Sequence, residues 1–165
     1  MEPGQTDTPP RLQEASSSPP LPGDYVSIIS RFGGGLLADE LWIYEPDHVN
    51  PDYDLVAQVE LKRRLMRELW SGEAPLATVL RVDLSKVMAW GETGSAEVLL
   101  WADESDREDS WPIIVWSPED STIERLEMSF AEVIVRSLRG QIPEEQFFSP
   151  CNFSSDHSLK PWPRQ

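Results

Sequence analysis

Two unbroken apolar runs constrain the fold more than any other feature of this 165-residue chain. Residues 98–101 read Val-Leu-Leu-Trp, and residues 112–116 read Pro-Ile-Ile-Val-Trp. A strand without polar alternation is typical of the interior of a sheet, where both faces are covered. Pro112 stands near the start of its strand, where the loss of one ladder hydrogen bond is tolerable. We therefore expect both runs to be inner strands with packed elements on each side.

Three other segments have the apolar spacing of amphipathic helices. In residues 22–33 the predicted buried face holds Tyr25, Ile28, Ile29 and Phe32. In residues 50–72, with Asn50 as the N-cap and Pro51 as the first helical residue, it holds Leu55, Val59, Met66 and Leu69. In residues 129–140, between a Ser129–Glu132 capping box and Gly140, it holds Phe130, Val133, Ile134 and Leu138.

Shorter strands are expected over residues 41–44, 86–90 and 122–128, so the order is helix, strand, helix, strands, helix. This order predicts a single α+β domain with helices packed against a largely antiparallel (mixed) sheet. Residues 1–20 are rich in Pro, Ser, Thr and Glu and predict a disordered leader before a domain over residues 21–142. Residues 143–165 predict an extended C-terminal tail, although Phe147, Phe148, Phe153 and Trp162 are apolar enough to pack back.

The formal net charge of -15 limits the classes of partner. A surface this acidic repels phosphate, which argues against nucleic acid and against anionic membrane. It favours fast encounter with a basic protein, and it fits a simple solubility trait almost equally well. The first ten residues contain neither a basic segment nor an apolar run, and no run approaches the roughly 20 apolar residues of a membrane-spanning helix. We therefore expect a cytoplasmic protein without a membrane segment.

The residues that carry most catalytic and metal chemistry are few. There are two histidines, His48 and His157, and one cysteine, Cys151, so no internal disulfide can form. His48 follows Asp47, but the sequence shows no further partner for a nucleophilic or metal site. Five acids between residues 103 and 109 lack the glycine and the terminal glutamate of an EF-hand loop. We expect no enzymatic activity, no cofactor and no bound metal.

Acids and tryptophans are the candidates for a surface that contacts another protein. A solvated loop is the simplest interpretation of the acids, and burial is the simplest for any one tryptophan; Trp101, Trp111 and Trp116 are expected in the core. The hypothesis of a binding surface is that carboxylates contact Lys and Arg of a partner while aromatic side chains anchor it. The candidate partner-binding residues are Asp103, Glu104, Asp106, Glu108, Asp109, Glu119, Asp120, Trp42 and Trp90.

The order of these motifs resembles the SUKH superfamily, which includes the yeast Smi/Knr cell-wall synthesis regulators. Its opening helix is matched by Leu21, Pro22, Asp24, Tyr25 and the glycines Gly33, Gly34 and Gly35. Its central strands and acidic loop are matched by Trp90, Gly94, residues 98–101, residues 103–109, Trp111, Pro112 and residues 113–115. Its closing helix is matched by Ser129 and Phe130. The resemblance covers roughly residues 21–140, whereas the basic helix after Asn50 and the C-terminal tail depart from it.

The resemblance implies an α+β fold and a role in protein binding. Bacterial members of the superfamily are commonly immunity proteins, which bind a toxin made by the same cell and block it. Many such toxins are basic nucleases, so a toxin domain is the expected partner and a monomer or weak homodimer the expected state. The alternative is a regulatory or scaffold protein of the Smi/Knr type that has no toxin partner.

Overall fold

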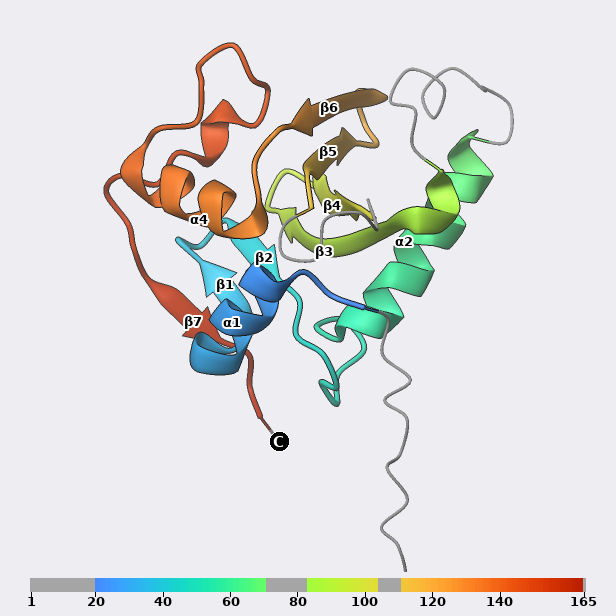
Figure 1. Cartoon of the computed structure of the whole chain (residues 1–165), viewed down its shortest axis with the longest axis horizontal. Coiled ribbons are helices and arrows are strands. Elements are labelled where there is room, and N and C mark those ends of the chain that lie inside the picture. The colour runs from blue at the N-terminus through green and yellow to red at the C-terminus, as the bar shows by residue number, and fades with distance from the viewer. Residues whose placement is uncertain (1–19, 71–82, 104–110, 165) are drawn as a thin grey trace, which may run out of the picture.

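The computed structural model describes residues 20–70, 83–103 and 111–164, and within these ranges seven strands form one antiparallel sheet (Figure 1). The strand order across the sheet is β6-β5-β4-β3-β2-β1-β7. The strands are β1 (Gly35–Leu37), β2 (Leu41–Ile43), β3 (Val87–Thr93), β4 (Val98–Ala102), β5 (Ile113–Ser117), β6 (Thr122–Leu126) and β7 (Leu159–Pro161). The helices are α1 (Gly23–Phe32), α2 (Leu55–Trp70) and α4 (Phe130–Arg139), with single 3-10 turns η1 (Leu84–Lys86) and η2 (Ser149–Cys151). The predicted α+β class is confirmed.

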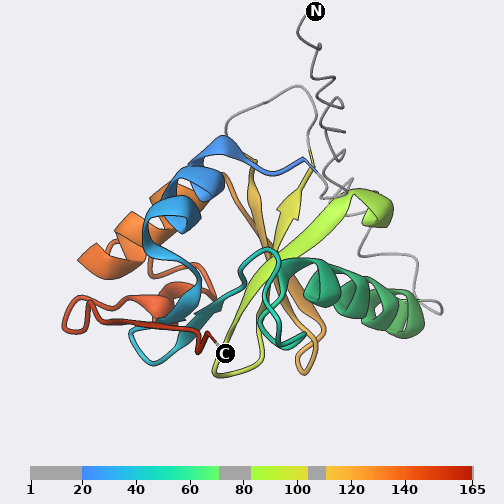
Figure 2. The same cartoon turned by 90° about the horizontal axis from the view of Figure 1, so that it is seen from below.

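The two apolar runs lie side by side as inner strands, as their composition predicts. Val98 pairs with Trp116 and Trp101 pairs with Ile113, and every residue of β4 and β5 is buried. Helices cover the sheet on both sides (Figure 2). On one side Tyr25 of α1 packs edge-on against Trp101 and Phe130, with ring centroids 4.7 and 5.1 Å away. The expected placement of Trp101 in the core is thereby confirmed.

Helix α2 packs on the opposite side of the sheet, against β3. Lys62 Nζ lies 2.6 Å from Glu92 Oε2, and Arg63 Nε donates a hydrogen bond to the Val87 carbonyl at 2.9 Å. The buried stripe of α2 includes Leu55 and Val59. These contacts lie on the sheet face that carries Glu92, which is also the face that carries Trp42.

Two side chains of the opening motif, Tyr25 and Asp24, fix α1 to the rest of the domain by hydrogen bonds. The Tyr25 hydroxyl donates a hydrogen bond to the Tyr44 carbonyl at 2.7 Å, and burial raises the pKa of this phenol. Asp24 accepts hydrogen bonds from the backbone N–H groups of Tyr25 and Ala131, at 2.8 and 2.9 Å. One carboxylate therefore lies at the N-terminal ends of both α1 and α4, where helix dipoles favour negative charge. Pro22, just before α1, is buried.

The predicted capping box of α4 is present. The Ser129 side chain accepts from the Glu132 N–H at 3.3 Å, and Glu132 Oε2 accepts from the Ser129 N–H at 2.9 Å. Gly140 ends the helix in the left-handed conformation, with φ 64°. Phe130, Val133 and Ile134 are buried, as the periodicity predicts.

Replacing Ser129 by Ala removes the acceptor for the Glu132 N–H. We expect the free energy of unfolding to fall by about 1 kcal/mol, measured by urea denaturation. Ser30→Ala, at an exposed position on α1, is the matched control and should change stability by less than about 0.5 kcal/mol. Equal effects of the two substitutions would show that the cap does not contribute.

Two residues on the predicted buried faces, Phe32 and Leu69, are in fact exposed at the ends of their helices. Phe32 at the end of α1 is 57% exposed and lies under the Arg31 guanidinium, whose Cζ is 5.5 Å from the ring centroid. Leu69 near the end of α2 is 58% exposed. The prediction that both are buried is wrong, because periodicity tells which side of a helix faces the domain but not how far the neighbouring element reaches.

The start of α2 also differs from the prediction. The helix begins at Leu55, and the Asp54 carboxylate accepts from the Ala57 N–H at 2.8 Å as its cap. Asn50 instead holds a turn: its side chain accepts from the Asp52 N–H at 2.9 Å. Asn50 and Pro51 therefore belong to the β2–α2 loop.

The C-terminal segment is part of the packed domain. β7 pairs with β1, Phe148, Cys151 and Phe153 are buried, and Trp162 donates an indole hydrogen bond to the Ile43 carbonyl at 2.8 Å. Packing therefore continues past the expected boundary at residue 142, and the interpretation of residues 143–165 as an extended tail is corrected for the described part up to residue 164. The expected leader lies outside the described residues, apart from residue 20.

Close backbone approach explains two of the glycines that the sequence assigns to the exit of α1. A Cβ on Gly35 would lie 2.4 Å from the Lys160 carbonyl oxygen, and one on Gly34 would lie 2.7 Å from that of Ile43. Gly33 ends α1 at φ 75° and ψ 176°, a positive-φ conformation that glycine adopts without a steric penalty. Gly33 thus ends α1, and Gly34 and Gly35 leave room for the close approach of the β2 and β7 backbones.

Candidate functional site

The acidic candidates do not form one described surface. Asp103 is half-buried at the end of β4, whereas Glu119 and Asp120 are exposed in the turn between β5 and β6. The β4–β5 register places this turn at the opposite end of the sheet from Asp103. Asp120 accepts a hydrogen bond from the Ser117 hydroxyl at 3.2 Å, which stabilises the turn. Four other acids lie outside the described residues: Glu104, Asp106, Glu108 and Asp109.

Trp90 is a core residue, so its assignment to a partner-binding surface is corrected. Its side chain is 0% exposed and packs edge-on against Phe130, with ring centroids 4.8 Å apart. The β3–β4 register shifts between Ala89 and Gly91, so a regular strand alternation does not apply at Trp90. Trp111 and Pro112 are also buried, which confirms the expectation for Trp111.

Trp42 lies at a half-buried aromatic cluster, formed by Trp42, Tyr53 and Trp162. Trp42 pairs across β2 and β3 with Glu92, so it is on the α2 side of the sheet. Tyr53 and Trp162 stack with centroids 4.1 Å apart and an interplanar angle of 3°. The Trp42 ring lies 5.5 Å from Trp162 and 6.2 Å from Tyr53. The cluster joins β2, the β2–α2 loop and the C-terminal segment.

His48 connects two of these parts, the β2–α2 loop and the C-terminal segment. Its Nδ1 lies 3.0 Å from the Asn50 nitrogen and accepts that N–H, while Nε2 lies 3.2 Å from the Pro163 carbonyl and donates to it, a tautomer inferred from these partners. The ring also packs edge-on against Tyr53 at 5.4 Å. His48 therefore holds the loop against the C-terminal segment.

The other groups considered for catalysis lie apart from His48. Burial raises the pKa of the Cys151 thiol to about 12, with Glu97 and Glu40 adding to the rise, so the reactive thiolate is disfavoured. His157 Nε2 is 2.8 Å from the Leu138 carbonyl. Within residues 20–70, 83–103 and 111–164, no three His, Cys, Asp or Glu side chains gather in a way that could hold a metal ion.

Two adjoining hollows flank Val49 on the β2–α2 loop, which projects from the domain between α1 and α2 (Figure 1). One hollow, of about 460 Å³, is lined by His48, Val49, Asn50, Pro51, Tyr53 and Pro163. The other, of about 230 Å³, is lined by Glu45, Asp47, His48, Val49 and Arg164. Val49 is 73% exposed between them, and Asp47 has a left-handed backbone at φ 60°. We call the residues lining the two hollows the loop surface. It presents the exposed side chain of Val49 beside the rings of His48 and Tyr53, which line the larger hollow with it.

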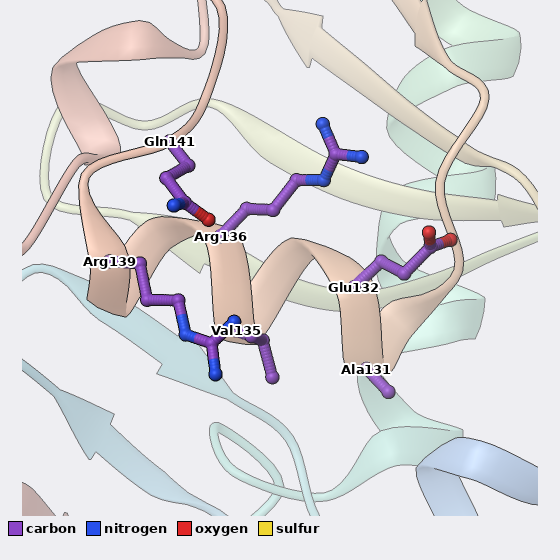
Figure 3. Close-up of a pocket in the computed structure, with 6 residues that line it drawn as sticks. All are labelled: Ala131, Glu132, Val135, Arg136, Arg139 and Gln141. Carbon is purple, nitrogen blue, oxygen red and sulfur yellow. The ribbon is translucent and has the colours of Figure 1, made fainter.

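A larger hollow, of about 540 Å³, lies along the outward side of α4 (Figure 3). Its lining residues are Ala131, Glu132, Val135, Arg136, Arg139 and Gln141. The Glu132 carboxylate belongs to the capping box, and the two arginines are in the last helical turn, where the dipole favours cations. In Figure 3 the Arg136 and Arg139 side chains extend in different directions. The Glu132 carboxylate is thus engaged within its own helix, whereas the loop surface has an exposed valine beside aromatic side chains, so we take the loop surface as the candidate site.

Sequence reasoning selected Trp42 but not the residues that surround it. Tyr53, Trp162 and Arg164 come from a turn assigned to a helix and from a segment assigned to a tail. The signal for the C-terminal residues was the group of aromatic side chains in that segment, Phe147, Phe148, Phe153 and Trp162.

Among the described residues, no helix has the length and apolar character required to cross a bilayer. No protein-family model matches the chain, and neither the curated proteins nor the solved structures contain a significant match.

Proposed function

We propose that this protein is a protein-binding module, and specifically an immunity protein that binds and neutralises a toxin made by the same cell. The observation that carries the proposal is the loop surface, where Val49 is 73% exposed beside two hollows, the larger of which is also lined by Tyr53, a ring that stacks on Trp162. Exposed apolar side chains backed by aromatic rings are typical of binding hot spots. The resemblance to the SUKH superfamily supports the toxin-directed form of this function.

The charge of the protein supports a basic partner. A net charge of -15 accelerates encounter with a basic protein and disfavours approach to phosphate. Exposed ion pairs contribute only about 0–1 kcal/mol each, so affinity requires a desolvated centre. The loop surface supplies that centre, while the acids around the domain supply the steering. A toxin with a basic active-site groove has the chemistry that matches both.

Val49→Asp tests the role of the loop surface. The substitution places a charge at the projecting apolar position, and we expect recovery of the partner from the producing cell to fall at least about tenfold. Val135→Asp on α4 is the matched control, because Val135 is also an exposed valine but lies outside the loop surface. Circular dichroism and thermal unfolding should show both variants folded. Equal recovery with both variants would contradict this surface.

The captured protein then decides between immunity and its alternative. If expression of that protein alone stops growth and co-expression of the wild-type chain restores growth, the protein is an immunity protein. If the captured protein is harmless and its activity changes on binding, the regulatory or scaffold alternative replaces the immunity function. Enzymatic turnover of a small substrate that is lost with His48→Ala would contradict both.

A further inference from the structure

The smaller hollow of the loop surface already holds a guanidinium group from the protein itself. Arg164 Nη2 lies 3.6 Å from Glu45 Oε1, at a side chain that is 77% exposed, whereas the Glu45 side chain is only 16% exposed. Gly33 lies beside both: a Cβ there would be 3.3 Å from Glu45 Oε2 and 3.5 Å from Arg164 Nη2. The hollow is therefore formed where the end of α1, the loop and the C-terminal segment meet.

The Glu45 carboxylate is held in place before any partner arrives. Glu45 Oε2 accepts the Gly34 N–H at 2.8 Å, and the Glu45 backbone bonds to the Tyr53 carbonyl at 2.9 Å and the Leu55 N–H at 3.0 Å. Because Oε2 is bonded to Gly34, Oε1 is the oxygen that pairs with Arg164, and three neighbouring segments fix the position of Glu45. A fixed carboxylate loses little freedom on binding a cation.

The guanidinium of Arg164 fills this position only loosely. Its 3.6 Å separation from Oε1 exceeds the 2.7–2.9 Å of a charge-assisted hydrogen bond, and the hollow has a volume of about 230 Å³. Asp47, which is exposed, lines the same hollow and brings a second carboxylate. The site therefore has two acids for one weakly held cation.

We propose that this hollow is an arginine-binding site, in which a guanidinium from the basic partner lies between Glu45 and Asp47 and displaces Arg164. The inference deepens the proposed function and rests on it for the source of the arginine. Arginine is favoured over lysine because its planar group can donate two parallel hydrogen bonds to a carboxylate, while an ammonium acts as a point charge. Arg164 is then an internal competitor that lowers the affinity for the partner.

The substitution that removes Arg164 gives the most specific expected change in affinity. Because an exposed ion pair is weak, Arg164→Gln should tighten arginine binding by about two- to fivefold rather than weaken it. Asp47→Asn, which keeps a residue that tolerates a left-handed backbone, should weaken binding by about two- to fivefold. Glu45→Gln should abolish measurable binding. Arg139→Gln on α4 removes the same charge elsewhere and should leave affinity within about 1.5-fold of wild type.

The probe is the peptide acetyl-Gly-Arg-Gly-amide, compared with its lysine counterpart, in a titration of the whole protein followed by NMR. The reporters are the amide signals of Gly33 and Gly34 and the indole N–H of Trp162. We expect these signals to shift with the arginine peptide at lower concentration than with the lysine peptide, and earlier still in Arg164→Gln. The order of affinities Arg164→Gln, wild type, Asp47→Asn is the supporting result.

Equal affinity of wild type and Arg164→Gln, or of wild type and Asp47→Asn, would overturn the arginine site. So would binding of the lysine peptide as tight as that of the arginine peptide. These outcomes leave the partner-capture result with Val49→Asp untouched, so the proposed function would stand without this site. Conversely, the arginine peptide can bind as expected even if partner capture is unaffected by Val49→Asp. The failure of the arginine site and the failure of the proposed function can therefore be told apart.

Discussion

Phe130→Ala is expected to lower the free energy of unfolding by about 3–5 kcal/mol, the largest single effect that we expect in this protein. The side chain is 0% exposed and lies at the centre of the aromatic packing between α1, α4 and the sheet. Its ring centroid is 4.8 Å from that of Trp90, 5.1 Å from Tyr25 and 6.2 Å from Trp101. Truncation leaves a cavity that rigid aromatic neighbours cannot close. Such a loss is a large share of the roughly 5–15 kcal/mol that stabilises a domain.

Urea denaturation followed by tryptophan fluorescence measures this effect, because Trp90 and Trp101 report on the packing around Phe130. Phe32→Ala is the control: the same substitution at a side chain that is 57% exposed should cost less than about 0.5 kcal/mol. Phe130→Leu should fall between the two, since it keeps much of the buried volume. Similar losses for Phe130→Ala and Phe32→Ala would contradict the described core.

Gly35→Ala is expected to cost about 2–3 kcal/mol and to separate β7 from β1. The added Cβ would lie 2.4 Å from the Lys160 carbonyl oxygen, a backbone atom that a side-chain rotation cannot move away. Either the two strands separate or β1 shifts toward β2. Loss of the β7 pairing would also release Trp162 from Tyr53, so the loop surface would change together with stability.

Hydrogen exchange of the β1 and β7 amides measures the separation, and urea denaturation measures its cost. We expect faster exchange at these strands, with β4 and β5 still protected. Gly94→Ala is the control, because its Cβ would approach the end of the Glu40 side chain at 3.0 Å, and a side chain can rotate away. Unchanged exchange in Gly35→Ala would contradict the close approach of β7.

The inner strands and the two ends of α4 could be predicted because their causes are local. Residues 98–101 and 113–115 are apolar without interruption, and this composition is typical of strands covered on both faces. The Ser129–Glu132 box and Gly140 act within their own helix turns, so the position of α4 follows from its sequence. The α+β class then follows from the order of the elements.

Burial at the ends of the elements could not be predicted in the same way. Phe32 and Leu69 have the right helical spacing, but their exposure depends on where the neighbouring elements stop. Trp90 is buried at a register shift, and a shift of one residue reverses the side to which a strand residue points. Each of these outcomes depends on tertiary contacts rather than on local pattern.

The candidate site was the least predictable part for the same reason. Trp42 was expected to contact a partner, but its surroundings come from residues far along the chain: the Trp162 indole bonds to Ile43 across 119 residues. Arg164 and Glu45 meet only because β7 pairs with β1. The apolar residues of this 23-residue segment indicate that it can pack back, but not which strand it pairs with.

The position of β7 has a consequence for synthesis on the ribosome. β1 emerges early, but β7, which completes its outer edge, follows 124 residues later, as the pairing of Leu36 with Lys160 shows. At roughly 5–20 residues per second, that edge stays open for about 6–25 s of translation. During this interval the nascent chain exposes unpaired backbone groups that another strand could bind. A slow codon run or a stalled ribosome before residue 159 would lengthen this period of vulnerability.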